Sequence, residues 1–89
     1  MRVDLTKKFI KRLKIIPTKI RTAFRDRYEL FINNPFNPIL NNHALTGEYA
    51  GRRSIDVTGD WRVIFSEYQG DKEKIIVFEL INTHSELYK

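Results

Sequence analysis

Two histidines, His43 and His84, are the residues of this sequence best suited to acid–base chemistry. The histidine side chain has an unperturbed pKa near neutrality, so it can accept a proton in one step and donate one in another. The sequence contains no cysteine, which excludes thiolate nucleophiles, thiolate metal ligands and disulfides. Any catalysis therefore depends on nitrogen and oxygen groups.

Other polar side chains accompany the histidines in the C-terminal half of the chain. They include carboxylates, guanidinium groups and a phenol: Arg53 or Ser54, Asp56, Asp60, Arg62 and Tyr88. This set matches metal-free RNA cleavage, in which a base activates the 2′-hydroxyl, a cation stabilises the phosphorane and an acid protonates the departing 5′-oxygen. Arg62 suits the phosphate because a guanidinium is a planar, permanently charged fork. An aromatic ring near the chain end could stack on a splayed base.

The first half of the chain is predicted to contain two helices. Phe9, Leu13 and Ile16 recur at helical spacing. Thr6 is a plausible N-cap for this helix, and Pro17 ends it. A second apolar stripe then extends to an Asn-Asn-Pro turn signal: Ile20, Phe24, Tyr28 and Phe31. We expect the two helices to form a helical hairpin.

The second half of the chain is predicted to form strands at residues 53–57, 61–67 and 74–82. The last of these is apolar on both faces, which favours a position in the middle of a sheet. Residues 2–5 could supply an edge strand. We therefore predict one α+β domain over residues 1–89, with an N-terminal helical hairpin packed on one face of a curved, mainly antiparallel sheet of three to four strands. The polar candidates would then project from the opposite, open face.

The composition describes a small basic globular protein. Sixteen Lys and Arg against 11 Asp and Glu give a net charge of +5, which favours polyanionic partners such as RNA. We expect contacts to RNA from four residues: Arg53, Asp56, Lys11 and Arg12. No apolar run reaches the length of a signal peptide or the roughly 20 residues of a membrane span. We therefore expect a cytoplasmic protein without membrane contact.

Structural roles remain open for some of these residues. His43 follows two asparagines and could be a solvent-exposed or capping residue, and Asp60 could cap its own turn. A metal site built from His43, His84, Asp56 and Asp60 would match no recurrent ligand spacing. We therefore predict neither a metal ion nor another cofactor.

Two motifs of the second half resemble those of a known family. The first runs from His43 to Phe65 and reads HALTGEYAGRRSIDVTGDWRVIF, with a histidine, a Leu-x-Gly step, a Gly-x-Arg step and Asp-Trp before an apolar strand. The second reads NTHSELY and ends at Tyr88. Both resemble the core of RelE-family toxins, specifically the YafQ-like branch of the RelE/ParE superfamily. The two motifs also keep the order and separation of that branch.

The resemblance implies the toxin of a type II toxin–antitoxin system with a RelE-like microbial RNase fold. Such a toxin is an mRNA interferase, a metal-independent endoribonuclease that cleaves mRNA on the ribosome and is held inactive by a cognate antitoxin. His43, Asp60 and His84 match active-site positions of the family. Tyr88 takes the place of the terminal aromatic residue, and Arg62 matches an arginine that contacts the phosphate.

The sequence departs from the family pattern at two positions. Asp56 stands where the YafQ branch has a histidine, and Leu80 stands where an arginine is expected on the last strand. Two other functions therefore stay open: a ParE-like toxin that inhibits DNA gyrase without nuclease activity, or a catalytically impaired relative that still binds an antitoxin. The set of His43, Asp60 and His84 favours the ribonuclease, because a gyrase inhibitor needs no acid–base groups. Which residue is the acid and which the base stays open.

Overall fold

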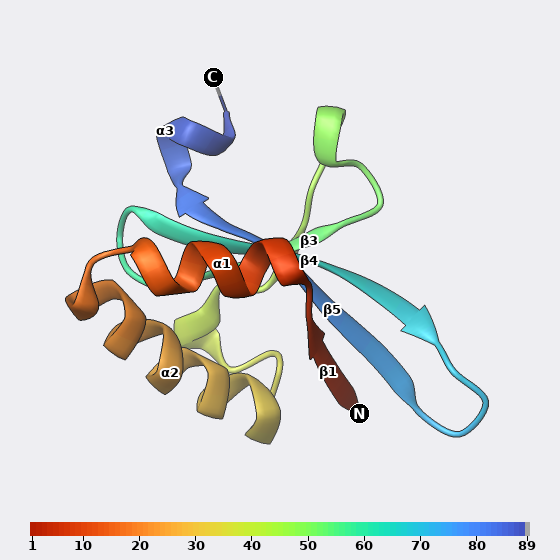
Figure 1. Cartoon of the computed structure of the whole chain (residues 1–89). Helices are drawn as coiled ribbons and strands as arrows, with labels where there is room; N and C mark the ends of the chain where they lie inside the picture. Colours follow the sequence, from red (N-terminus) through yellow and green to blue (C-terminus); the bar gives the residue numbers. More distant parts are fainter. Residues whose placement is uncertain (89) are drawn as a thin grey trace.

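A five-stranded sheet organises the chain in the computed structural model, which describes residues 1–88 (Figure 1). In chain order the strands are β1 (Arg2–Leu5), β2 (His43–Ala44), β3 (Arg53–Asp56), β4 (Trp61–Gln69) and β5 (Lys74–Thr83). The remaining elements are the helices α1 (Lys7–Ile15), α2 (Thr18–Asn33) and α3 (His84–Leu87), with the 3-10 turns η1 (Pro38–Leu40) and η2 (Gly47–Tyr49). The strands lie in the order β1-β5-β4-β3-β2, and of their pairings only β1 with β5 is parallel.

Thr6 connects β1 to α1 and caps the helix. Its hydroxyl accepts a hydrogen bond from the Phe9 amide at 3.0 Å, which satisfies one of the unpaired amides of the first turn. Its main-chain amide donates to the Phe78 carbonyl at 3.2 Å, so the cap is also tied to β5. Pro17 lies immediately before α2, where its missing amide proton leaves no hydrogen bond unmade. Both residues have the roles that the sequence predicted.

One apolar core lies between the helices and the sheet. Phe78 on β5 is central to it, with ring centroids 5.4 Å from Phe31 and 5.8 Å from both Phe9 and Phe65. Every apolar residue of the two predicted helical stripes is part of this core or packs against it. The buried members are Phe9, Ile16, Phe24, Phe31, Leu40, Ile55, Val57, Val63, Phe65, Ile76, Phe78 and Ile81.

A β-bulge interrupts the alternation of β5. The register between β4 and β5 slips after Ile64, and Glu79 is left without a partner residue on β4. The extra residue reverses the alternation of the strand, so Phe78 and Ile81 are both buried in the core although they lie three positions apart. The strand occupies the interior of the sheet, between β1 and β4, as its composition predicted.

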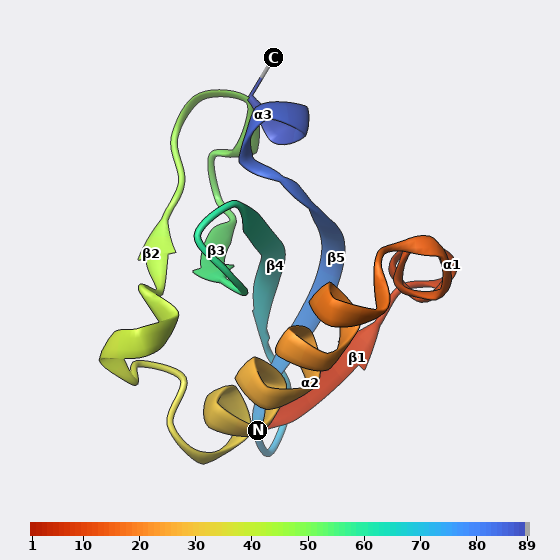
Figure 2. The same cartoon turned by 90° about the vertical axis from the view of Figure 1, so that its left-hand side faces the viewer.

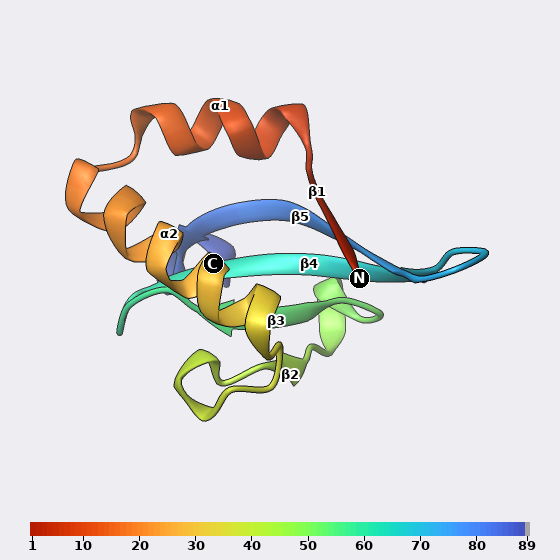
Figure 3. The ribbon, with the colours of Figure 1, turned by 90° about the horizontal axis from the view of Figure 1, so that it is seen from below.

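The two longer helices occupy different places around the sheet. α2 crosses one face, whereas α1 lies beside β5 on the side away from β4 (Figure 2 and Figure 3). The reason is the length of β1, whose four residues pair with β5 only as far as Phe78. Beyond that point the edge of β5 is open, and α1 packs along it.

The predicted number of three to four strands was wrong, because the sheet has five. β2 is the strand that the sequence did not indicate, since its two residues are too few to show an alternation. It pairs antiparallel with β3, so His43 belongs to the edge of the sheet. The α+β class is confirmed, and residues 2–5 do form an edge strand. Within residues 1–88, no helix has the length and apolar character of a membrane span.

Candidate active site

A small open cleft lies near the point where β5 passes into α3. Its volume is about 210 Å³. The turn before β2, the strands β2, β3 and β4, and the α3 segment all contribute to its lining: Asn41, His43, Ser54, Arg62, His84 and Tyr88. The fold therefore brings four of the five predicted catalytic residues to one place, and it adds two polar neighbours.

His43 reaches the cleft from the edge strand β2, and its ring is held by one hydrogen bond. Nδ1 lies 2.7 Å from the main-chain carbonyl oxygen of Asn41. Because a carbonyl oxygen only accepts, Nδ1 must carry a proton, and the neutral ring then has its lone pair on Nε2. Asn41 has the left-handed conformation, with φ 49°, which asparagine tolerates better than most residues. This turn gives His43 a defined acceptor nitrogen.

Arg62 and Asp56 are directly opposed residues on β4 and β3. Arg62 Nε lies 2.9 Å from Asp56 Oδ1. The contact is an ion pair without hydrogen-bond alignment, since that buried oxygen has no aligned donor. Nη1 of Arg62 donates to the carbonyls of Thr58 at 2.9 Å and Trp61 at 3.2 Å. Among residues 1–88 we find no partner for Nη2, so the guanidinium retains donors for a ligand oxygen.

An aromatic wall borders the cleft: His84 and Tyr88 line it from the α3 segment, and Tyr49 of η2 packs against Tyr88. The ring centroids of His84 and Tyr88 lie 4.8 Å apart, and Tyr49 meets Tyr88 edge-on at 5.8 Å. The His84 amide donates to the Asp60 carbonyl at 2.8 Å, which ties α3 to the turn before β4. Leu87 is buried and anchors the other side of the helix.

Tyr88 is uncharged near neutral pH. Even with 43% of its surface exposed, partial burial raises the pKa of its phenol above the ordinary value of 10.0. Tyr49 raises this pKa further, whereas the positive charge of Arg62 lowers it. The ring can therefore stack or donate a hydrogen bond, but its oxygen is unsuited to the role of base.

Asp60 is the predicted catalytic residue that does not line the cleft. It lies exposed in the turn between β3 and β4, and its carboxylate has no hydrogen bond or ion pair to another residue within 1–88. Thr58, not Asp60, caps this turn. Its Oγ1 accepts hydrogen bonds from the amides of Asp60 at 3.3 Å and Trp61 at 3.2 Å. The link from Asp60 to the cleft is its main-chain carbonyl, which accepts a hydrogen bond from the His84 amide.

Ser54, not Arg53, faces the cleft from β3. Arg53 Nε donates to Asn42 Oδ1 at 2.8 Å, and its guanidinium lies over the Phe36 ring at 5.6 Å from the centroid. Strand alternation places Arg53 on the sheet face opposite Ser54, away from the two histidines. The position of Arg53 therefore does not support the predicted contact with an RNA held in the cleft.

The two basic candidates of α1 line a separate, mainly apolar groove between α1 and β5, which has a volume of about 520 Å³. Lys11 is exposed there, whereas the guanidinium of Arg12 is bound to Glu86 and Asn82. Leu80, which replaces the arginine expected on the last strand, also lines this groove. Among the residues that line the cleft, Arg62 is therefore the one guanidinium.

Two residues of the site were not predicted from the sequence. Asn41 orients His43, and its side chain also lies 3.4 Å from Asp56 Oδ2. The pair of asparagines before His43 was the available signal, since asparagine favours turns in the left-handed conformation. Tyr49 completes the aromatic wall from η2, a segment whose sequence carries no comparable signal.

The described part of the chain, residues 1–88, contains no group of three or more His, Asp or Glu side chains arranged to hold a metal ion. His43 and His84 share the cleft, but Asp56 is paired with Arg62 and Asp60 lies outside it. The four residues considered as a metal site are therefore not arranged as one.

Comparison with known proteins gives a consistent result. The family model described as YafQ, bacterial toxin of type II toxin–antitoxin system, matches residues 1–89. The fold is similar to that of YafQ from E. coli strain BL21(DE3), with a TM-score of 0.76 and 24% identity over 100% of both chains. A chain of the E. coli DinJ–YafQ toxin–antitoxin complex gives a TM-score of 0.72 and 24% identity over 98% of this chain and 96% of that one. A chain of the archaeal RelE–RelB complex from Pyrococcus horikoshii OT3 gives 0.69 and 23% over 92% of each. No curated protein sequence gives a match.

Proposed function

The chain belongs to the YafQ family of toxins of bacterial type II toxin–antitoxin systems, and on this premise we propose that it is a metal-independent endoribonuclease that cleaves mRNA on the ribosome. The observation that carries the proposal is the cleft lined by His43, Arg62 and His84. Two groups able to exchange protons and one permanent cation then surround a space in which a phosphodiester can bind. The site of action is the cytoplasm, where mRNA is translated.

His43 is the general base in this proposal. Its Nε2 takes the proton of the 2′-hydroxyl, because Nδ1–H is already committed to the Asn41 carbonyl. The activated O2′ attacks the adjacent phosphorus, and the guanidinium of Arg62 binds the charged phosphorane oxygens. The orientation of Arg62 comes from Asp56, which holds Nε while Nη2 remains available.

His84 is the general acid. As an imidazolium it gives its proton to the departing O5′, so the products are a 2′,3′-cyclic phosphate and a 5′-hydroxyl. Tyr88 supports this step by holding the His84 ring and by offering a face to a splayed base. Asp60 contributes by position, because its main-chain carbonyl accepts a hydrogen bond from the His84 amide at 2.8 Å.

A cognate antitoxin is the second partner that we propose. In the two complexes similar to this chain, E. coli YafQ is bound to DinJ and P. horikoshii RelE is bound to RelB. The groove between α1 and β5 is apolar at its base and has Lys8, Lys11 and Lys14 along its border. Such a groove suits an acidic, amphipathic segment that folds on binding.

The test is induced expression of the wild type beside His43→Gln and His84→Gln, with mapping of the 5′ ends of cellular mRNA. We expect new codon-linked ends for the wild type, and cleavage reduced by roughly 10²- to 10⁴-fold in both variants. Lys72→Gln is the control, because Lys72 lies in the β4–β5 loop at the opposite end of β5 from His84.

Two outcomes would contradict the proposal. Growth arrest with intact mRNA and damaged DNA would instead support a gyrase inhibitor of the ParE type. Complete loss of cleavage on addition of a chelator, with recovery on addition of a divalent ion, would overturn the metal-independent mechanism.

A further inference from the structure

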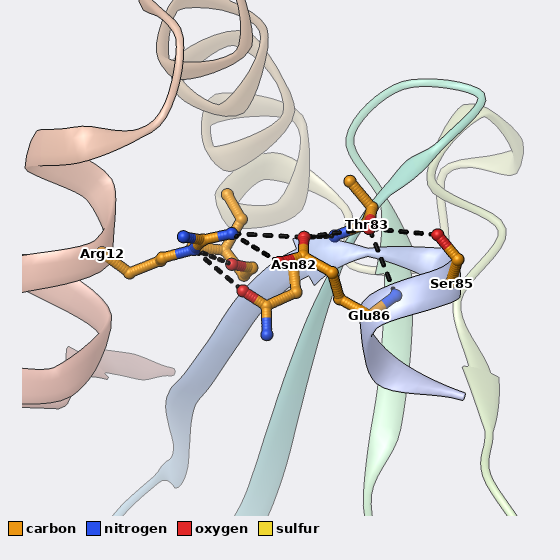
Figure 4. Close-up of polar contacts among 6 residues, drawn as sticks. Arg12, Asn82, Thr83, Ser85 and Glu86 are labelled. Carbon is orange, nitrogen blue, oxygen red and sulfur yellow. Dashed lines mark hydrogen bonds and ion pairs between the residues drawn. The ribbon is translucent and has the colours of Figure 1, made fainter. Parts of the chain in front are cut away.

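Arg12 on α1 makes a set of contacts that no other basic residue of that helix makes within residues 1–88 (Figure 4). Its Nε donates to Asn82 Oδ1 at 2.9 Å and to the Ile81 carbonyl at 3.4 Å. Its Nη2 lies 3.2 and 3.1 Å from the two carboxylate oxygens of Glu86. The guanidinium also lies over the Trp61 ring, 5.6 Å from its centroid. One side chain thus joins α1 to β4, β5 and α3.

Glu86 receives this contact while it closes the first turn of α3. Its Oε1 accepts from the Thr83 amide at 3.0 Å and from the Thr83 hydroxyl at 2.9 Å. The Glu86 amide donates to Thr83 Oγ1 at 3.2 Å in return, which completes a capping box. The guanidinium of Arg12 therefore binds the residue that defines where α3 begins.

α3 needs such external contacts because it has only four residues. A single helical turn is not stable by itself in water, since the nucleation cost exceeds what one hydrogen bond returns. Three other contacts hold α3: the burial of Leu87, the contact between the Tyr49 and Tyr88 rings, and the hydrogen bond from the His84 amide to the Asp60 carbonyl. These lie toward the core and the cleft, whereas Arg12 holds the helix from the side of α1.

We propose that Arg12 is a positioning residue of the RNA-cleaving site: its guanidinium holds α3 in place and thereby sets His84 and Tyr88 against the cleft. The catalytic consequence rests on the proposed function, whereas the position of α3 is a property of the free protein. Arg12 is also placed among the predicted RNA-binding residues, but its fork is already occupied by Asn82 and Glu86. Its contribution is therefore to geometry more than to affinity for RNA.

The first experiment measures amide hydrogen exchange by NMR in the purified chain, without RNA. In Arg12→Gln we expect the amides of His84 and Tyr88 to exchange about 10-fold faster or more, with β4 unchanged. Lys14→Gln is the matched control. Lys14 is the other basic residue in the last turn of α1, so this substitution removes the same charge from the helix end. Arg12→Lys should fall between the two, since it keeps the charge but loses the fork.

The second experiment measures single-turnover cleavage of mRNA on programmed ribosomes. Arg12→Gln should lower the maximal rate by roughly 10- to 100-fold, with the half-saturating toxin concentration changed by less than about 2-fold. Loss of a residue that only binds RNA would instead raise the half-saturating toxin concentration and leave the maximal rate nearly unchanged. Glu86→Gln keeps a side chain able to form the capping box but removes the charge that Arg12 binds. The double variant should therefore be no slower than Arg12→Gln alone.

If the amides of His84 and Tyr88 in Arg12→Gln exchanged at the same rate as in the wild type, the proposal would be overturned. Should Arg12→Gln fail to fold, Glu86→Gln and Arg12→Lys carry the same comparison, and unchanged exchange in both would be equally decisive. Absence of cleavage by the wild type would contradict the proposed function alone, because the exchange measurement does not depend on activity.

Discussion

The two histidines of the cleft are held in different ways. The His43 ring donates from Nδ1 to the Asn41 carbonyl, which leaves Nε2 as an acceptor. The His84 ring has no hydrogen bond to another residue within 1–88 and is placed by its main chain and by contact with the Tyr88 ring. A ring with one committed donor suits the base, and a ring with both nitrogens available for protons suits the acid. This difference supports the roles that we propose.

At Tyr88 the structure separates two roles of the side chain, the aromatic face and the hydroxyl. Because the phenol pKa is raised above 10.0, mainly by burial, the hydroxyl stays neutral at assay pH and exchanges no proton there. We expect Tyr88→Phe to cleave mRNA within about 3-fold of the wild type, whereas Tyr88→Ala should lose roughly 10- to 100-fold with the stacking surface. Single-turnover rates measure both. An equal loss in the two variants would assign the hydroxyl a chemical role.

The histidines are carried by the shortest strand and the shortest α-helix of residues 1–88. β2 has two residues and α3 has four. Neither is stable without its neighbours, so His43 depends on pairing with β3, and His84 depends on the capping box and on Arg12. The proposed active site is thus built on elements whose positions are decided by tertiary contacts.

The capping box predicts how α3 responds to acid. The pKa of Glu86 is held below its ordinary value of 4.5, first by the Thr83 amide, then by the Thr83 hydroxyl, and with a further contribution from Arg12. Ionised Glu86 therefore stabilises α3 at a pH above 4.5, the ordinary pKa. This stabilisation is lost as the pH falls through the lower pKa that Glu86 has in the folded state. Protection of the Tyr88 amide from hydrogen exchange should therefore fall as the pH drops below about 4.5, with β4 unaffected. Glu86→Gln should show no such fall, and a fall of the same size in that variant would contradict this account.

At the scale of the whole molecule, β5 connects the core to the site. Its first half carries Phe78 into the aromatic core, its bulge lies at Glu79, and its end leads directly into His84. The bulge keeps Ile81 buried and so fixes the direction in which the strand enters α3. Damage to the core is therefore expected to reach the cleft through one strand.

Phe78 is the core residue with the largest predicted effect on stability. Five aromatic rings surround it at centroid distances from 5.4 to 6.1 Å: Phe9, Phe24, Tyr28, Phe31 and Phe65. Phe78→Ala should cost about 3–5 kcal/mol, a large part of the roughly 5–15 kcal/mol that stabilises a small domain. Phe36→Ala is the control, because 63% of Phe36 is exposed, and it should cost less than about 1 kcal/mol. Denaturant unfolding measures both, and similar midpoints would contradict the central position of Phe78.

The sequence by itself determined the types of the main elements and the chemical groups available. Helical stripes such as Phe9, Leu13 and Ile16, the cap at Thr6 and the alternation after Arg53 depend on backbone geometry over a few neighbouring residues, so they can be recognised locally. The two histidines and the absence of cysteine likewise restricted the chemistry before any fold was known.

Only the tertiary structure decided which groups meet. β2 exists because His43 and Ala44 pair with β3, Tyr49 reaches Tyr88 across the fold, and Arg12 binds Glu86, 74 positions away. None of these contacts leaves a periodic trace in the sequence, because each depends on how distant segments pack and not on local conformational preference. Most residues of the cleft could be named in advance, but the side chains that hold His43 and His84, and with them the roles of base and acid that we propose, required the packed structure.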